Sequence, residues 1–198
     1  ATTGREQADI TGLIGQYAHG NEPSHHMAWL YNYTNTPHKT TVRVHQILNE
    51  MYQAAPDGLS GNEDCGQMSA WYVMSAMGIY AVTPGRPEYN LCAPLFPYIK
   101  INLENGKTFE IVAKGVDAGK TKIQSARLNG KTLESLVIDH QTIMDGGKLE
   151  YEMGEFAYTK ENMISWAGPK PRMPKSSIAG PEIPVVPYFD RPHAGGDY

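Results

Sequence analysis

Cysteine is scarce in this sequence. Only Cys65 and Cys92 occur among the 198 residues. Two cysteines can form at most one disulfide, and their spacing fits neither a metal-binding cluster nor a disulfide-dense secreted scaffold. We therefore expect both side chains to be free thiols.

Long apolar runs are also missing, which excludes a membrane-spanning helix because such a helix needs about 20 apolar residues. The first residues, Ala1-Thr2-Thr3-Gly4-Arg5, contain no initiator methionine and no apolar signal segment. Any signal peptide would lie outside this chain. With 40% hydrophobic residues, the sequence can bury one sizeable core or two small ones, and it predicts a soluble protein.

No charge of one sign dominates. Seventeen basic and 21 acidic residues are mixed along the chain and give a formal net charge of -4. Without a basic patch, the sequence lacks the electrostatic signature of a protein that binds nucleic acid or an anionic membrane. We therefore expect no nucleic-acid partner.

Residues 1–93 show mainly helical patterns. Thr36-Pro37 is a typical helix start, and the apolar residues that follow recur at helical spacing. These are Val44, Ile47, Leu48 and Met51. The spacing also predicts a second helix from about Gln67 to Tyr80 and a shorter one beginning near Pro23.

Residues 94–154 show strand patterns instead. Asn105-Gly106 predicts a two-residue hairpin, and Asn129-Gly130 predicts a second one. Gly146-Gly147 marks a further turn, between Ile143 and a strand over 149–153. We expect this region to be antiparallel β.

From residue 155 to 198 we expect an extended Pro-rich tail, because the last part of the chain, from Gly154, holds seven of the 14 prolines. Its apolar residues near 183–189 favour packing along the body.

The first polar loop, 19–26, precedes a predicted helix. Its Asn21 and Glu22 offer the hard oxygen atoms that Ca²⁺ prefers, between Gly20 and Pro23, which could fix the bend. The alternative is that Glu22 and nearby hydroxyl groups only cap the helix. Adjacent His25 and His26 would leave a helix about 100° apart, which disfavours a zinc site.

The second polar loop, 58–67, holds Asn62, Glu63 and Asp64 between glycines and ahead of a helix. The positive end of a helix favours ionised carboxylates, and an ionised carboxylate in a cleft can act as a general base for glycoside hydrolysis. The alternative is again helix capping. Cys65 could instead be a nucleophile, but the neighbouring carboxylates would raise the pKa of its thiol.

Three motifs give the loops a family context. They are Gly20-Asn21-Glu22-Pro23-Ser24-His25-His26, the run Gly61-Asn62-Glu63-Asp64-Cys65-Gly66-Gln67-Met68-Ser69-Ala70-Trp71-Tyr72, and Pro84-Gly85-Arg86-Pro87-Glu88-Tyr89. In this order they closely resemble the glycoside hydrolase family 92 exo-α-mannosidases, over about residues 12–154. The resemblance implies an α+β fold in which the helices form the last part of an (α/α)6 barrel, followed by an antiparallel β region.

The resemblance also implies roles. In that family an inverting reaction takes place around a Ca²⁺ ion that contacts the mannose hydroxyls. Asn21 and Glu22 fall in the calcium-binding segment, and Asp64 falls on the general base. Asn62 stands where the family often has a second aspartate, so it cannot itself act as a base. The candidates for substrate binding are His19, His25, His26 and Glu63.

The family's general acid lies well before the calcium loop, so the resemblance implies a C-terminal fragment of a longer, calcium-dependent exo-α-mannosidase. We expect the isolated chain to be inactive, with mannose-containing glycans and the remaining N-terminal part as its partners. The resemblance further implies a secreted, periplasmic or cell-surface location. The alternative function is a calcium-dependent carbohydrate-binding or structural module without turnover.

Overall fold

The computed structural model describes residues 10–155, so the expected tail from residue 156 onward lies outside the described range. The described chain contains helices mainly in its first half and strands mainly in its second. They are β1 (Leu13–Ile14), β2 (Tyr17–Ala18), η1 (Glu22–Ser24), η2 (Met27–Tyr33), α1 (His38–Glu50), α2 (Gln67–Ala76), β3 (Ile79–Tyr80), β4 (Glu88–Leu91), β5 (Tyr98–Asn102), β6 (Thr108–Val112), η3 (Val116–Ala118), β7 (Lys122–Leu128), β8 (Lys131–Thr132), β9 (Val137–Asp139), α3 (His140–Met144) and β10 (Gly147–Gly154). The mixed α and β content agrees with the predicted class.

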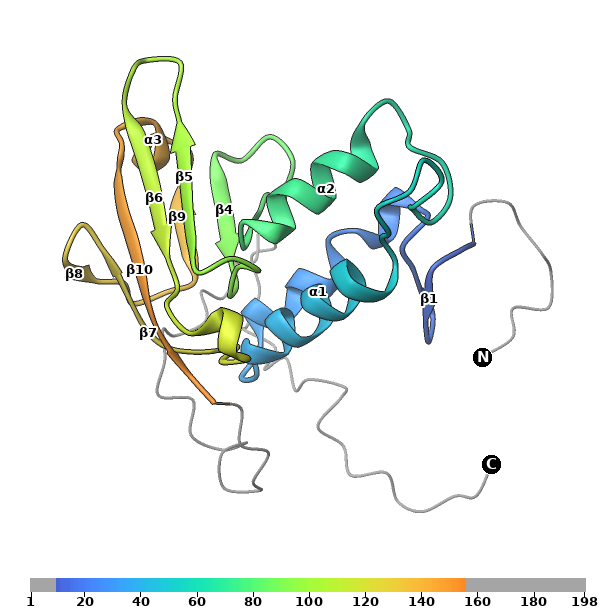
Figure 1. Cartoon of the computed structure of the whole chain (residues 1–198), viewed down its shortest axis with the longest axis horizontal. Coiled ribbons are helices and arrows are strands. Elements are labelled where there is room, and N and C mark those ends of the chain that lie inside the picture. Colours follow the sequence, from blue (N-terminus) through green and yellow to red (C-terminus); the bar gives the residue numbers. More distant parts are fainter. Residues whose placement is uncertain (1–9, 156–198) are drawn as a thin grey trace, which may run out of the picture.

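Helices α1 and α2 pack against each other on one side of the molecule, and the largest sheet lies on the other (Figure 1). The helix predicted after Thr36-Pro37 is confirmed as α1. Its predicted apolar stripe is buried at Val44, Ile47 and Leu48. Between residues 10 and 155, no helix has the length and apolar character needed to cross a membrane.

The predicted end of the second helix is wrong. Helix α2 stops at Ala76 rather than near Tyr80, because Gly78 takes a left-handed conformation with φ of +74°. The Gly78 carbonyl accepts a hydrogen bond of 2.9 Å from the Cys92 backbone N–H. The chain thereby turns into β3, and Tyr80 leaves the helix. The segment near Pro23 also differs from a regular helix, since it forms the two 3₁₀ helices η1 and η2.

The largest sheet has five strands in the order β5-β6-β10-β7-β8. Neighbouring strands in it are antiparallel, except that β6 and β10 run parallel with Ile111 opposite Leu149. The expectation of a purely antiparallel region is therefore wrong in this one pairing. A parallel pair needs a long connection, and residues 113–146 supply it.

Both predicted hairpins are present. Asn129-Gly130 joins β7 to β8 as a two-residue turn with positive φ at both positions, as the sequence predicts. The loop between β5 and β6 is longer than predicted, because the Gly106 N–H bonds to the Leu103 carbonyl and Gly106 takes φ of +79°. The strand predicted over 149–153 is confirmed within β10, but β10 already begins at Gly147, which was predicted as part of a turn, and Ile143 lies in the short helix α3.

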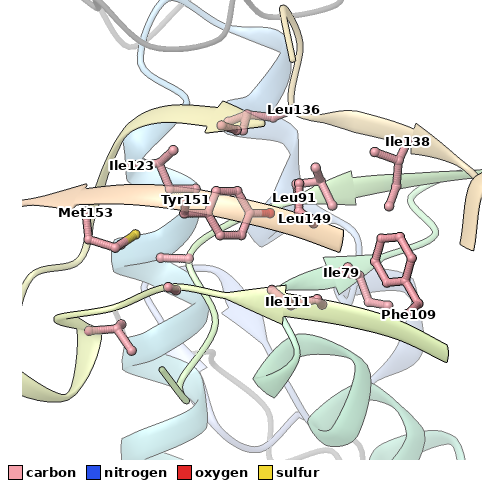
Figure 2. Close-up of a cluster of buried hydrophobic side chains, with 14 of the residues drawn as sticks. Ile79, Leu91, Phe109, Ile111, Ile123, Leu136, Ile138, Leu149, Tyr151 and Met153 are labelled. Carbon is pink, nitrogen blue, oxygen red and sulfur yellow. The ribbon is translucent and has the colours of Figure 1, made fainter. Parts of the chain in front are cut away.

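A smaller sheet crosses the boundary predicted between residues 93 and 94. Its order is β3-β4-β9, so β4 from the first part pairs with β9 from the second. The two sheets share one core, and Figure 2 shows Ile79 of β3 in the same cluster as Phe109 and Leu149. The division into 1–93 and 94–154 stays a prediction, although the packing of the described residues is continuous across it.

A second core holds the helices together. It is centred on the fully buried indoles of Trp29 and Trp71 and on the stripe of α1. The Trp71 side chain donates a hydrogen bond of 3.2 Å to the carbonyl of His25. This core therefore fixes the loop 19–26 against α2, the helix that follows the loop 58–67.

Candidate active site

The two polar loops meet at one pocket of about 340 Å³. Loop 19–26 contributes Glu22 and His26, and loop 58–67 contributes Asp64. The remaining wall comes from Gln67 at the start of α2 and from Tyr80, Ala81, Val82 and Pro84. The fold thus brings the Asp64 carboxylate to Glu22 and His26, which lie more than 30 residues earlier in the sequence.

Of the two neighbouring carboxylates, Glu63 takes the helix-capping role. The Glu63 side chain accepts hydrogen bonds of 3.0 Å from both the backbone N–H and the hydroxyl of Ser69, in the first turn of α2. Its carbonyl also accepts the Met68 N–H. Since Glu63 caps the helix, the adjacent Asp64 side chain is directed to the pocket instead.

The backbone around Asp64 is unusual. Asp64, Cys65 and Gly66 have φ angles of 52°, 57° and 96°, three left-handed residues in succession. For the two non-glycine residues this conformation costs about 1–3 kcal/mol each, and such strain persists only where the surroundings fix it. Backbone strain of this kind gathers at functional sites, which agrees with a role for Asp64 in the pocket.

Glu22 is held in its ionised form. Its pKa is lowered by a hydrogen bond from its own backbone N–H, next by a hydrogen bond with the Asp64 side chain, and further by His25. The two carboxyl groups therefore lie within hydrogen-bonding reach of each other across the pocket. Two carboxyl groups at this separation either share a proton or bind a cation.

His25 and His19 lie behind the pocket and are fully buried. Nε2 of His25 bonds to the His19 carbonyl at 2.9 Å, and its Nδ1 faces the Gln67 amide at 3.3 Å. His19 bonds to Tyr17 at 2.8 Å and to Tyr52 at 2.6 Å. Burial, with the neighbouring His25, lowers the pKa of His19 to about 3, and burial also lowers that of His25. Both rings are neutral at pH 7.

The geometry gives the three predicted histidines different surroundings. His26 lines the pocket beside Glu22 and Asp64, where a sugar hydroxyl could reach it. Both ring nitrogens of His19 are already hydrogen-bonded inside the protein, as are those of His25. Direct sugar contact by His19, His25 and Glu63 stays a prediction, and what the structure shows is that they support the loops.

Asn21 and Asn62 stay predictions as site residues. Asn21 stands at the N-cap of η1, where its side chain makes no capping bond to the described residues. Asn62 is exposed just before Glu63. Within residues 10–155, no group of three or more histidine, cysteine, aspartate or glutamate side chains forms a metal cluster. Glu22, Asp64 and the Asn21 amide are nevertheless all hard oxygen donors, and such a set fits Ca²⁺ better than Zn²⁺.

The two thiols are free, as predicted, with Cys65 exposed and Cys92 buried. Burial raises the pKa of Cys92, which keeps it an inert thiol. In the part of the chain that the structure describes, no histidine is hydrogen-bonded to Cys65. The thiol-nucleophile alternative thus lacks a base.

The sequence assigned no role to five residues of the pocket wall, which are Gln67, Tyr80, Ala81, Val82 and Pro84. A signal existed for Gln67, because it is the last residue of the acidic loop 58–67 and the first residue of its helix. For Tyr80 there was none, since its position depends on the reversal at Gly78. Tyr80 stacks on Trp29 with ring centroids 5.5 Å apart.

Comparison with known proteins gives these features a context. A profile described as the glycosyl hydrolase family 92 catalytic domain matches residues 1–155. A protein from Arthroderma benhamiae named "Uncharacterized secreted glycosidase" is 32% identical over 164 residues, which make up 81% of this chain and 20% of that protein.

Two solved structures from Bacteroides thetaiotaomicron have similar folds. A family GH92 α-mannosidase in complex with mannoimidazole is 40% identical with a TM-score of 0.70, over 75% of this chain and 20% of that one. A family GH92 inverting mannosidase is 37% identical with a TM-score of 0.68, over 80% of this chain and 21% of that one. The chain thus spans about a fifth of the length of the relatives it matches.

Proposed function

Because the chain belongs to glycosyl hydrolase family 92, we propose that it carries the base-and-metal half of an active site that hydrolyses α-mannosides in glycans. One observation carries the proposal. Glu22, His26 and Asp64, which come from two loops distant in sequence, converge on one pocket. The names of the similar solved structures, an α-mannosidase and an inverting mannosidase, support the substrate and the reaction type.

In the proposed reaction Asp64 removes a proton from water as the water attacks the anomeric carbon, and the configuration of that carbon inverts. His26 binds a sugar hydroxyl. His19, His25 and Glu63 hold the two loops in place, and Asn62 helps to orient the water without taking its proton.

The proposed cofactor is Ca²⁺, with Asn21 and Glu22 among its ligands. Bound there, it would fix sugar hydroxyls and supply positive charge near the reacting carbon. Glu22 suits this role because its own backbone N–H lowers its pKa, which keeps a negative oxygen available.

The general acid of the proposed reaction lies outside the described residues. Inverting glycosidases place acid and base about 6.5–9.5 Å apart, and the acid must be protonated at the working pH. Glu22 is held ionised, and Glu63 is committed to Ser69. Accordingly we propose that the acid belongs to an N-terminal part of an (α/α)6 barrel, and that this chain alone does not cleave unactivated mannobiose.

A secreted, periplasmic or cell-surface location is part of the proposal. It is supported by the word "secreted" in the name of the Arthroderma benhamiae relative.

The test of the base is Asp64→Asn in an active enzyme that carries this chain. We expect kcat to fall by about 10²- to 10⁴-fold, since a general base usually contributes this much. Asp57→Asn, which removes an exposed carboxylate outside the pocket, should leave kcat unchanged. Retention of more than about a tenth of kcat by Asp64→Asn would reject the assignment. Sugar binding by the wild-type protein without mannose release would instead favour the binding-module alternative.

The test of the cofactor is chelation of the same enzyme followed by addition of single metals. We expect Ca²⁺ to restore activity and Zn²⁺ not to do so, because the donors are hard oxygens. Glu22→Ala should weaken calcium binding more than Glu63→Ala does. Activity that is indifferent to chelation would refute the calcium proposal.

A further inference from the structure

A hydrogen-bonded chain of rings, with His19 buried between two part-buried tyrosines, connects the loop 19–26 to the first turn of α2. It runs from Tyr17 through His19 to Tyr52 and ends at the Met68 carbonyl. None of these four residues lines the pocket that contains Asp64. Their contribution to the site must therefore be indirect.

The direction of every hydrogen bond in this chain follows from the group at its end, the Met68 carbonyl. A carbonyl only accepts, so the Tyr52 hydroxyl donates its proton to Met68 over 3.2 Å. That hydroxyl must then accept from His19, whose Nε2 carries the proton over 2.6 Å. Nδ1 of His19 is left as an acceptor for the Tyr17 hydroxyl at 2.8 Å. One tautomer of His19, with the proton on Nε2, satisfies all three bonds.

His25 provides a parallel connection with the same tautomer. Its Nε2 donates to the His19 carbonyl, and its Nδ1 accepts from the Gln67 amide. The two histidines thus join one loop to successive residues, Gln67 and Met68, at the beginning of α2. Because α2 begins only three residues after Asp64, a shift of its first turn would move the Asp64 carboxylate.

Tyr52 also holds the stem of the loop that leads to Asp64. Its backbone forms an isolated β-bridge to Leu59, and the Gln53 N–H bonds to the Gly58 carbonyl at 2.7 Å. The Tyr52 ring lies parallel to that of Trp71, at 3°, with centroids 6.3 Å apart. The Tyr52 side chain therefore contacts His19 of the loop 19–26, the Met68 carbonyl at the start of α2 and the Trp71 ring.

We infer that Tyr52 is a positioning residue, which uses the Nε2–H tautomer of His19 to hold the loop of Glu22 and the loop of Asp64 at a fixed separation. The inference rests on the proposed function, since it concerns the geometry of that site. Tyr52 does not touch substrate in this arrangement. Its hydroxyl matters because, among residues 10–155, it is the one side-chain group that bonds to both His19 and Met68.

The first test records the histidine ring nitrogens of the 198-residue chain by ¹H–¹⁵N NMR at pH 7.5. We expect His19 and His25 both to show the Nε2–H tautomer. Finding the proton of His19 on Nδ1 would overturn the inference without any variant. This measurement requires no catalytic activity, so it remains decisive even if the proposed function fails.

The second test compares Tyr52→Phe with Tyr72→Phe. The rings of Tyr52 and Tyr72 have centroids 4.8 Å apart, but among the described residues the Tyr72 hydroxyl makes no hydrogen bond. We expect Tyr52→Phe to speed exchange of the His19 ring proton with water by about tenfold or more and to shift the backbone signals of residues 64–68. Tyr72→Phe should change neither. Equal effects of the two variants would refute the role of the Tyr52 hydroxyl.

In an active enzyme that carries this chain, Tyr52→Phe should lower kcat by about tenfold or more with little change in KM, because misplacement of a catalytic group slows the chemical step. An unchanged kcat would overturn the inference even where the ring spectra respond. Failure of the proposed function would look different, since the wild-type enzyme itself would then release no mannose.

Discussion

Gly78 permits the chain reversal that brings Tyr80 into the pocket wall, and replacing it by alanine tests that reading. Its φ of +74° costs a residue with a side chain about 1–2 kcal/mol. The added Cβ would also lie 2.5 Å from the Cys92 carbonyl oxygen and 3.0 Å from the Pro94 nitrogen. Both are backbone atoms, so neither can move aside cheaply.

The magnitude follows from these contacts. Relief of the 2.5 Å contact would require Cys92 to shift, which weakens its hydrogen bond to Gly78, worth about 1 kcal/mol, and disturbs the fully buried Leu91 and Ala93. Alanine lowers the entropy of the unfolded chain and so returns about 0.4–1 kcal/mol. We expect Gly78→Ala to reduce the free energy of unfolding by about 2–4 kcal/mol.

Gly85→Ala is the matched control. Gly85 has φ of +83°, but no atom lies within 4 Å of the added Cβ. The free energy of unfolding of Gly85→Ala should therefore fall by only about 0.5–1.5 kcal/mol. Urea unfolding of both variants, followed by the fluorescence of buried Trp29 and Trp71, measures the difference. If the two losses agree within about 0.5 kcal/mol, the close approach to Cys92 does not contribute and the reasoning is wrong.

Two further predictions concern the candidate site and its supports. The free energy of unfolding should fall as pH is lowered from 7 to 5. Burial lowers the folded-state pKa of His19 and His45 below 6.5, so that in this range the unfolded chain binds protons which the folded chain does not. A free energy of unfolding that stays constant over this pH range in urea titrations would contradict the prediction. Glu63→Gln should destabilise the start of α2 by about 0.5–2 kcal/mol, because its hydrogen bonds to Ser69 become weaker. The control Glu155→Gln, which changes an exposed carboxylate, should have no effect. Amide hydrogen exchange of Ser69 measures the loss, and unchanged protection in Glu63→Gln would show that the cap is unimportant.

Local patterns predicted those parts of the fold that depend on neighbouring residues. The stripe of α1 and the Asn129-Gly130 turn need only periodicity and backbone preference, and both were correct. The parallel pairing of β6 with β10 could not be predicted, because it joins residues almost 40 positions apart. The early end of α2 was missed because Gly78 is constrained by Cys92, a residue that follows strand β4.

In the candidate site, too, local features could be predicted and features that depend on tertiary contacts could not. The two acidic loops were visible as clusters of polar residues before helices, and the fold brings Glu22 and Asp64 together. Which of two adjacent carboxylates caps the helix was not predictable, since Glu63 and Asp64 are chemically alike and only the left-handed turn at Asp64 separates them. The wall formed by Tyr80 and Pro84 depends on tertiary packing.

The order of strands in the large sheet has a consequence for synthesis of the protein. Strand β10 is central, between β6 and β7, yet it is the last strand in the described sequence. Until residues 147–154 have left the ribosome, β6 and β7 each expose an unpaired edge, which is a template for aggregation. A chain that stops before Gly147 would lack β10 and also the connection that β10 makes between its neighbours. The sheet would be left as two separate pairs of strands, β5-β6 and β7-β8.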